Sequence, residues 1–143
     1  MKELPKSIGT LSNLVEMSIS KCIALTSIPA EIGDCKNLED LNMNKCKNIT
    51  SLPDNFCNLR VLCMLDLRAC KKLVSLPRQI GNLTSLKFLD LRTCKRLETL
   101  PQSLGQLTRL EFLDVSDCAD LIIPKSLEKF NVIAHGWDED KIE

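Results

Sequence analysis

The 143-residue sequence contains no tyrosine, one tryptophan and one histidine. Histidine is the commonest general base in enzymes, and His135 lies close to the end of the chain, so catalysis that needs histidine would have to work from the edge of the molecule. The sequence also lacks a Gly-x-x-x-x-Gly-Lys-Ser/Thr loop for phosphates and any Cys-x-x-Cys pair for zinc. We therefore expect no enzyme activity, no cofactor and no metal site.

Net charge and long apolar runs are missing as well. The 19 basic side chains balance the 19 acidic ones, which argues against attraction of the whole chain to nucleic acid. The N-terminal segment has no apolar stretch of the kind found in secretory signals, and no apolar run approaches the roughly 20 residues of a membrane-spanning helix. These absences predict a soluble, cytoplasmic chain without a membrane span.

What the sequence does contain is a repeat of 24 residues. The segment 83–106 matches itself when it is shifted by 24 in either direction. The six prolines fall in one column of this register, with Pro124 one residue early, and four of the five glycines fall in another. We predict one solenoid domain over residues 1–130, followed by a C-terminal cap and acidic tail over 131–143. It consists of a partial repeat at 1–10 and five repeats that begin at Leu11, Cys35, Leu59, Leu83 and Leu107.

Within a repeat, the fifth to eleventh residues are expected to form a strand. In the segment 87–93, Leu89 and Leu91 alternate with polar neighbours, as in a strand with one buried face. The Leu-Pro step cannot continue a sheet but can begin a short helical or 3-10 turn, and we expect the Ile-Gly step to end it with a left-handed glycine. Because the turn takes more room than the strand, the pattern predicts an α/β solenoid with a parallel sheet on the concave face and short turns on the convex face.

The two ends of the solenoid are expected to differ. Residues 2–10 supply only half a repeat, without the polar cap usual for solenoids; either this half-repeat is cap enough, or the chain was cut from something longer. At the other end, Phe130 and Ile133 continue the apolar columns into an incomplete sixth repeat. We expect both side chains to close the core, with Trp137 folded over them and the acidic end frayed.

The cysteines are predicted to be structural. Small, buried free thiols behave as hydrophobic side chains, although strands about 4.8 Å apart leave oxidation in vitro open. Cys57 and Cys63 straddle a repeat boundary, and we interpret them as semi-buried thiols, the alternative being a metal pair. Five of the eight cysteines form a column spaced 24 residues apart: Cys22, Cys46, Cys70, Cys94 and Cys118.

Outward-facing strand residues form three columns across the repeats. Apolar side chains on a solvent-facing sheet are typical of interaction sites, and aromatic residues dominate binding hot spots. We therefore predict a protein-binding surface of Met64, Phe88 and Phe112, with aspartate and arginine columns that set specificity; the alternative is that a terminal loop or a missing domain covers it. The columns are Glu16, Asp40, Met64, Phe88 and Phe112; Ser18, Asn42, Asp66, Asp90 and Asp114; and Ser20, Asn44, Arg68, Arg92 and Ser116.

Two charged features leave alternatives open. Neighbouring aspartates repel one another, and either Arg68 and Arg92 compensate them as diagonal neighbours or a basic residue of the partner does.

Charge is also uneven along the chain, since residues 43–110 carry 12 basic and 4 acidic groups. A basic row beyond the strands either solvates that edge or binds anionic lipid or nucleic acid, and no aromatics alternate with it to support base stacking. The row is Lys45, Lys47, Lys71, Lys72, Lys95 and Arg96.

The pattern L-x-x-L-x-x-L-x-L-x-x-C-x-x-L-x-x-L-P-x-x-I-G-x resembles a leucine-rich repeat. Its cysteine column and Leu-Pro-x-x-Ile-Gly step resemble plant intracellular nucleotide-binding leucine-rich-repeat immune receptors, and the segment 4–14 resembles their helper class. The resemblance implies a non-catalytic module for protein interactions in plant defence and innate immune signalling. Its partner would be another protein or other domains of a parent receptor. The nucleotide switch of those receptors is not carried over, because the phosphate loop is absent.

Two other functions stay open at this point. Ras-pathway scaffolds also use Leu-Pro-x-x-Ile, although their repeats usually run one residue shorter and favour asparagine over cysteine. The chain also fits the recognition part of a repeat-bearing kinase or ligase whose catalytic domain lies elsewhere. The pattern predicts neither a particular partner nor an oligomeric state.

Overall fold

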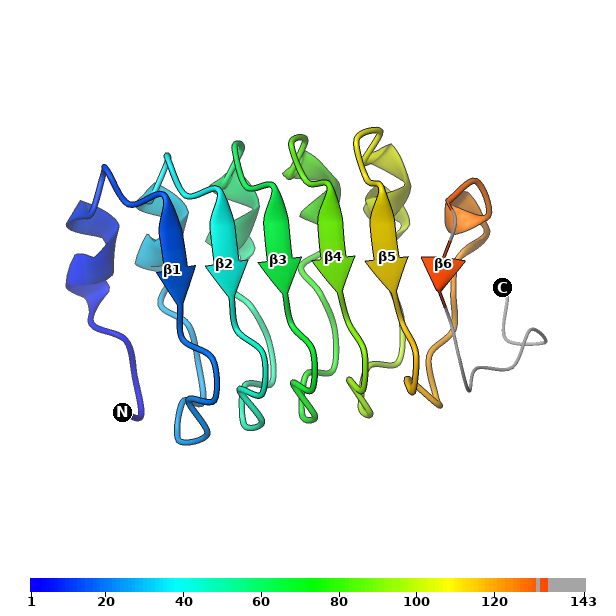
Figure 1. The fold of residues 1–143 in the computed structure, drawn as a ribbon, viewed down its shortest axis with the longest axis horizontal. Coiled ribbons are helices and arrows are strands. Elements are labelled where there is room, and N and C mark those ends of the chain that lie inside the picture. The colour runs from blue at the N-terminus through cyan, green and yellow to red at the C-terminus, as the bar shows by residue number, and fades with distance from the viewer. Residues whose placement is uncertain (131, 134–143) are drawn as a thin grey trace.

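The computed structural model describes residues 1–130 and 132–133, and it shows a solenoid with one strand and one 3-10 turn in each repeat (Figure 1). The strands form one parallel sheet in chain order: β1 Glu16–Ser18, β2 Asp40–Asn42, β3 Met64–Asp66, β4 Phe88–Asp90, β5 Phe112–Asp114 and β6 Val132–Ile133. The turns on the other side are η1 Lys6–Thr10, η2 Ala30–Asp34, η3 Asp54–Asn58, η4 Ile80–Asn82, η5 Gln102–Gln106 and η6 Lys125–Leu127. The predicted fold class is confirmed.

Backbone pairing extends beyond these short strands. The N–H groups of Lys87 and Phe88 donate to the carbonyl of Cys63 at 2.9 and 3.0 Å, and the N–H of Thr93 donates to the carbonyl of Ser116 at 2.8 Å. The predicted strand region 87–93 is thus hydrogen-bonded to both neighbouring repeats. Pairing follows the repeat period, so that residues at the same repeat position lie side by side.

The chain leaves each of the first five strands through the same turn. One residue in each turn has a φ between 59° and 62°, in the left-handed region, although none of the five is glycine. This conformation costs about 1–2 kcal/mol for an ordinary residue, and pairing of its N–H with the next repeat offsets that cost in four turns. The residues are Lys21, Lys45, Ala69, Thr93 and Asp117.

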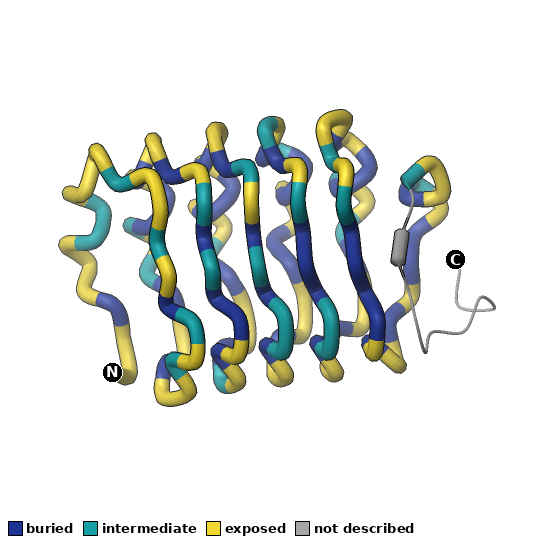
Figure 2. Tube along the Cα trace, in the orientation of Figure 1, coloured by how far each residue is buried: buried dark blue, intermediate teal, exposed yellow. Residues whose placement is uncertain are grey.

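The core lies between the sheet and the 3-10 turns (Figure 2). Inward strand residues such as Leu65, Leu67, Leu89 and Leu91 are 0% exposed. Stacking places each of them between its counterparts in adjacent repeats, and full burial of one such side chain stabilises the fold by about 1.5–3 kcal/mol. The apolar column that follows the cysteines is also 0% exposed: Leu25, Ile49, Leu73, Leu97 and Leu121.

The N-terminal end of the core is less well covered. Leu11 is 47% exposed, whereas Leu59, Leu83 and Leu107 at the same repeat position are 0% exposed. The half-repeat contributes a buried Leu4 and pairs with the first full repeat on the convex side, where the N–H of Thr26 donates to the carbonyl of Lys2 at 3.3 Å. It contributes no strand beside β1, so the sheet side of the first repeat stays exposed in the described chain.

At the C-terminal end, β6 pairs with β5 in the register Leu113 to Val132, which agrees with an incomplete sixth repeat. Phe130 packs partly buried against the core, and Lys129 Nζ lies 5.3 Å from the centre of its ring. The predicted roles of the Ile133 side chain, His135, Trp137 and the acidic end fall outside the described residues.

The predicted left-handed conformation of the repeat glycines is wrong. Their role is instead to let successive 3-10 turns approach closely, because a Cβ atom on Gly33 would lie 2.3 Å from the Asn55 carbonyl oxygen. A Cβ atom on Gly81 would lie 2.2 Å from the Ser103 carbonyl oxygen. Side-chain contacts of real Cβ atoms are never this short, so a larger residue forces the next turn away.

One repeat has cysteine at this glycine position, and there the stacking of turns is interrupted. Cys57 is 3% exposed, so the semi-buried environment expected for it is wrong. The following turn, η4, begins only at Ile80, whereas the other turns begin directly after proline. We attribute the short η4 to the Cys57 side chain, which fills space that glycine leaves to the next backbone.

A convex groove of about 960 Å³ lies beside the short turn η4, lined in part by Asp54, Arg78 and Gln79.

Alanine should destabilise the protein more at Gly81 than at Cys57, which occupies the equivalent repeat position. Gly81→Ala should lower the free energy of unfolding by about 2–3 kcal/mol, because overpacking forces the η4 and η5 backbones apart. Cys57→Ala, the matched change at the equivalent position, should cost less than about 1.5 kcal/mol, because space is already present there. Urea unfolding followed by circular dichroism measures both. Equal losses would contradict a role of Gly81 in close approach.

Candidate functional site

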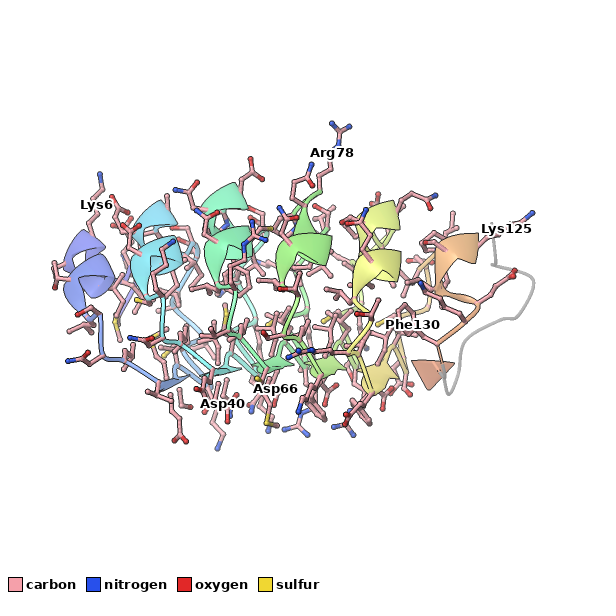
Figure 3. All side chains as sticks on the ribbon, turned by 90° about the horizontal axis from the view of Figure 1, so that it is seen from above. Lys6, Asp40, Asp66, Arg78, Lys125 and Phe130 are labelled. Atoms are coloured by element: carbon pink, nitrogen blue, oxygen red, sulfur yellow. The ribbon has the colours of Figure 1, made fainter. Side chains whose placement is uncertain are left out.

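The outward side of β1–β5, which we call the sheet face, carries the predicted columns side by side. Met64, Phe88 and Phe112 are paired across β3, β4 and β5, and Asp66, Asp90 and Asp114 are paired in the same way two residues later. In Figure 3, which looks along the strands, the sheet forms one layer and the 3-10 turns the other, with Asp40 and Asp66 on the sheet side and Arg78 on the opposite side. The sheet face thus presents each column as a continuous line of side chains.

An aromatic stack occupies one end of the sheet face. The rings of Phe88 and Phe112 lie parallel, with centroids 4.4 Å apart and an interplanar angle of 6°. Both residues remain partly exposed, and the neighbouring Met64 is 42% exposed. Aromatic pairs of this kind contribute about 0.5–1.5 kcal/mol beyond the area they bury, so the stack holds both rings in fixed positions at the surface. We call Met64, Phe88 and Phe112 the apolar patch.

The aspartate column has a structural role that the sequence patterning did not identify. Oδ1 of Asp66 and of Asp90 each accepts a hydrogen bond at 3.0 Å from the backbone N–H two residues later, on Arg68 and Arg92. Asp114 Oδ1 accepts in the same way from Ser116, at 2.9 Å. Each side chain therefore closes the turn that follows its strand, as aspartate and asparagine do in many turns. The signal was present in the sequence, because Asn42, Asp66, Asp90 and Asp114 share this chemistry.

Arg92 compensates the buried part of the aspartate column. Asp90 is 1% exposed and Asp114 is 5% exposed. Arg92 Nε donates to both carboxylate oxygens of Asp90 at 3.0 Å, its Nη2 lies 2.5 Å from Asp90 Oδ2, and its Nε lies 3.6 Å from Asp114 Oδ2. The hydrogen bond with Asp90 raises the pKa of Arg92. These contacts favour internal compensation over a basic partner residue at Asp90 and Asp114.

Arg68 behaves differently although it occupies the same repeat position as Arg92. Its guanidinium makes no hydrogen bond or ion pair within the described part of the chain. The nearby carboxylates are already engaged, since Asp66 Oδ2 accepts from Asn44 Nδ2 at 3.3 Å and Asp90 binds Arg92. Arg68 therefore adds a half-buried cation to the sheet face near the apolar patch, and its guanidinium has no bonded partner among the described residues.

Substitution of Asp90 tests its structural role. Asp90→Ala should lower the free energy of unfolding by about 2–4 kcal/mol, because it removes a buried hydrogen-bond acceptor and leaves Arg92 without its partner. Asp90→Asn retains an oxygen acceptor for the turn, as Asn42 does, so we expect roughly half that loss. Urea unfolding of both variants gives the comparison. Unchanged stability of Asp90→Ala would contradict the assigned role.

Four of the five cysteines of the column, all except Cys22, are buried and hydrogen-bonded. The thiols of Cys46, Cys70, Cys94 and Cys118 donate to carbonyls of the preceding repeat, at sulfur–oxygen distances of 3.0, 3.3, 3.2 and 3.0 Å. Burial raises the pKa of Cys70 to about 12 and that of Cys118 to about 11. All eight cysteines are free. The buried thiols with raised pKa values are poor nucleophiles, because the thiolate is the reactive form of cysteine.

Native-state alkylation should separate the cysteines into two groups. At pH 8, iodoacetamide should modify only Cys22 and Cys63, the two that are not buried, and it should modify all eight after unfolding in urea. Peptide mass spectrometry locates the modified residues, and Cys63→Ser provides a control that removes one site. Rapid modification of Cys70 in the folded protein would contradict its hydrogen-bonded burial.

Among the described residues, no group of three or more histidine, cysteine, aspartate or glutamate side chains is placed to hold a metal ion. Within the same part of the chain, no helix has the length and apolar character to cross a membrane.

Comparison with solved structures gives the same architecture. The leucine-rich repeat domain of the bacterial type III effector XopL is 27% identical, with a TM-score of 0.67 over 94% of this chain and 57% of that one. The Arabidopsis receptor kinase HAESA, solved with the peptide hormone IDA and the co-receptor SERK1, is 26% identical, with a TM-score of 0.64 over 94% of this chain and 24% of that one. The Drosophila Toll structure, solved as a complex with Spatzle, is 24% identical and supports the fold alone, with a TM-score of 0.69 over 96% of this chain and 19% of that one. The chain thus spans less than two thirds of each of these proteins.

Sequence comparisons define the family. No curated protein sequence matches the chain. A model of single leucine-rich repeats matches residues 37–59, and the model described as a leucine-rich repeat region matches residues 53–135, more than half of the chain. The match covers three of the five cysteine-column positions and both phenylalanines of the apolar patch. The chain belongs to the leucine-rich repeat family.

Proposed function

We propose that the chain is a non-catalytic protein-interaction module that binds its partner through the apolar patch and Arg68. The observation that carries this proposal is the partly exposed Phe88–Phe112 stack on a sheet whose backbone is hydrogen-bonded on both sides. Binding to a rigid surface requires little ordering of the chain, so less of the interaction energy is lost to entropy. Aromatic anchors of this kind dominate the energetics of protein interfaces.

Charge near the patch gives the interaction a preferred partner. Asp90 and Arg92 neutralise each other, whereas the guanidinium of Arg68 has no partner among the described residues. A binding segment with an apolar side chain for the patch and a carboxylate for Arg68 would satisfy both features. Asp66 accepts hydrogen bonds from Asn44 and from the backbone N–H of Arg68, but it forms no ion pair with the Arg68 guanidinium, which leaves that group available to a carboxylate of the partner.

The biological setting that we propose is plant defence and innate immune signalling in the cytoplasm, within a disease-resistance protein. The cysteine column and the Leu-Pro-x-x-Ile-Gly step support this setting through their resemblance to plant intracellular immune receptors, including the helper class. The structural likeness to HAESA, solved with a peptide hormone and a co-receptor, supports recognition of a protein or peptide. The partner would be another protein or another domain of the same receptor.

Removal of both rings tests the proposed surface. Phe88→Ala/Phe112→Ala should weaken binding of segments selected from a displayed peptide library by at least about 30-fold, as expected for hot-spot residues. The free energy of unfolding should fall by roughly 2–4 kcal/mol, from the loss of the stacking contribution and of the partial burial of both rings, and the variant should remain folded. Binding is measured by fluorescence anisotropy and stability by urea unfolding.

Val74→Ala/Ile122→Ala serves as the matched control, because these two apolar side chains are 39% and 38% exposed away from the strands. This variant should keep full binding. Unfolding of the double phenylalanine variant would identify the rings as core residues and refute the proposed function. Equal losses of binding in both variants would refute the assignment of the sheet face.

A further inference from the structure

A line of cations follows the turns at the C-terminal ends of β1–β4. We call these residues the lysine edge: Lys21, Lys45, Lys47, Lys71, Lys72, Lys95 and Arg96. All seven are exposed. They come from four successive repeats, and none of them belongs to the sheet face.

The shape of this edge follows from the repeated turn. Because the turn adopts the same left-handed residue in each repeat, with φ of 59–62°, equivalent side chains leave the backbone in the same direction. Adjacent turns are spaced by about 4.8 Å, as adjacent strands are. Figure 1 shows the turns side by side along the lower edge of the sheet, to which the strand arrows point. The seven cations thus lie along a protruding line rather than in a cleft.

The charge of the lysine edge is not neutralised within the described part of the chain. The ion pairs there belong to Arg92 with Asp90 and Asp114, and the lysine edge takes part in none of them. Carboxylates lie beside this line at Glu98, two residues beyond Arg96, and at the fifth turn, where Asp117 and Asp120 line a shallow hollow together with Lys95. Four neighbouring turns therefore present seven positive charges, bounded at one end by three negative ones.

The opposite edge of the sheet lacks such a line. The turns that lead into β2, β3 and β5 contain the cations Lys36, Arg60 and Arg109, and Lys87 directly precedes β4. Acidic residues accompany them, since Glu39 and Glu111 directly precede β2 and β5. Two of the cations are bonded to nearby backbone, since Lys36 Nζ donates to the Gly33 carbonyl at 2.7 Å and Arg60 Nη1 donates to the Asn82 carbonyl at 3.3 Å. The balanced net charge of the chain thus conceals one strongly cationic edge.

We propose that the lysine edge binds peripherally to the surface of an anionic lipid bilayer. A protruding, straight edge can touch a flat surface along its whole length, whereas it cannot enclose a small anion. Six of the seven cations are lysines, which act as point charges without the paired donors that arginine offers to individual phosphates. Juxtaposed basic residues of this kind are attracted to anionic lipid.

An apolar side chain on the same edge strengthens this assignment. Ile23 occupies the repeat position of Lys47, Lys71 and Lys95, and it is 57% exposed. On a bilayer this side chain can enter the boundary between headgroups and acyl chains. Nucleic acid is disfavoured, because no aromatic side chain accompanies the cations to stack on bases. Since the strands point toward the edge, a docked solenoid keeps its sheet face accessible to a protein partner (Figure 1).

Vesicle binding tests the proposal with the full chain. Sedimentation with vesicles of phosphatidylcholine alone is compared with sedimentation with vesicles containing 30% phosphatidylserine, in buffers of 0.15 M and 1 M salt. We expect binding to the phosphatidylserine vesicles at 0.15 M salt and loss of binding at 1 M, where the screening length falls from about 8 Å to about 3 Å. Phosphatidylcholine vesicles should leave the protein in solution.

Charge reversal on the two edges provides the matched comparison. Lys71→Glu/Lys72→Glu/Lys95→Glu should lower the partition coefficient at least about 100-fold, since each lysine near an anionic surface contributes roughly a fivefold factor. Lys36→Glu/Arg60→Glu/Arg109→Glu changes the net charge equally on the opposite edge and should lower it less than about tenfold. Thermal unfolding confirms that both variants are folded. The Phe88→Ala/Phe112→Ala variant should retain vesicle binding, which separates this surface from the sheet face.

Three results would overturn the proposal. The first is that the wild-type chain stays in solution with phosphatidylserine vesicles at 0.15 M salt. The second is that the two charge-reversal variants lose binding equally, which would show a response to net charge alone. The third is that a 20-base-pair RNA duplex or a polyglutamate peptide binds the lysine edge while the vesicles do not.

Discussion

Hydrogen bonding between repeats is the constraint on which the structure depends. Every strand is only two or three residues long, and such a strand has no stability by itself. Pairing in fixed register supplies partners for the backbone, as for Thr93, whose N–H reaches the next repeat at 2.8 Å. Because the register equals the repeat length, residues at the same repeat position lie side by side and form a column along the solenoid. A side chain that recurs at one repeat position therefore forms a continuous line on the surface or in the core.

Several details of the repeat serve this pairing. Glycines at the ends of the 3-10 turns permit close stacking on the convex side. Aspartate or asparagine closes the turn after the strand, as Asp66 and Asp90 do, and the cysteine thiols bond to carbonyls of the preceding repeat, as Cys94 does with Leu67. Thiol, carboxylate and glycine are chemically unrelated, but each leaves the backbone of one repeat in position to meet the next. The few positions without such a role are the ones available for binding.

The columns could be read from the sequence because they depend only on spacing. The period of 24 placed Phe88 beside Phe112 and Asp90 beside Asp114, and the structure confirms both pairs. Spacing does not reveal what lies against a residue from the neighbouring repeat. The sequence therefore predicts a left-handed glycine at Gly81, where the structure shows a close approach to the next turn. The different contacts of Arg68 and Arg92 are likewise not predicted by spacing. The two arginines share one repeat position, yet only Arg92 is paired, because Asn44 and Arg92 already engage the carboxylates near Arg68.

The replacement of glycine by Cys57 shows how unequally the two layers respond to a change in sequence. The turn that follows Cys57, η4, begins only at Ile80 on the convex side, whereas β3 and β4 remain paired without a shift in register. The convex layer therefore accommodates the larger side chain by a local change in one 3-10 turn. The sheet keeps its strand register across the same repeats. In a solenoid built this way, convex positions can vary one repeat at a time without moving the surface that meets a partner.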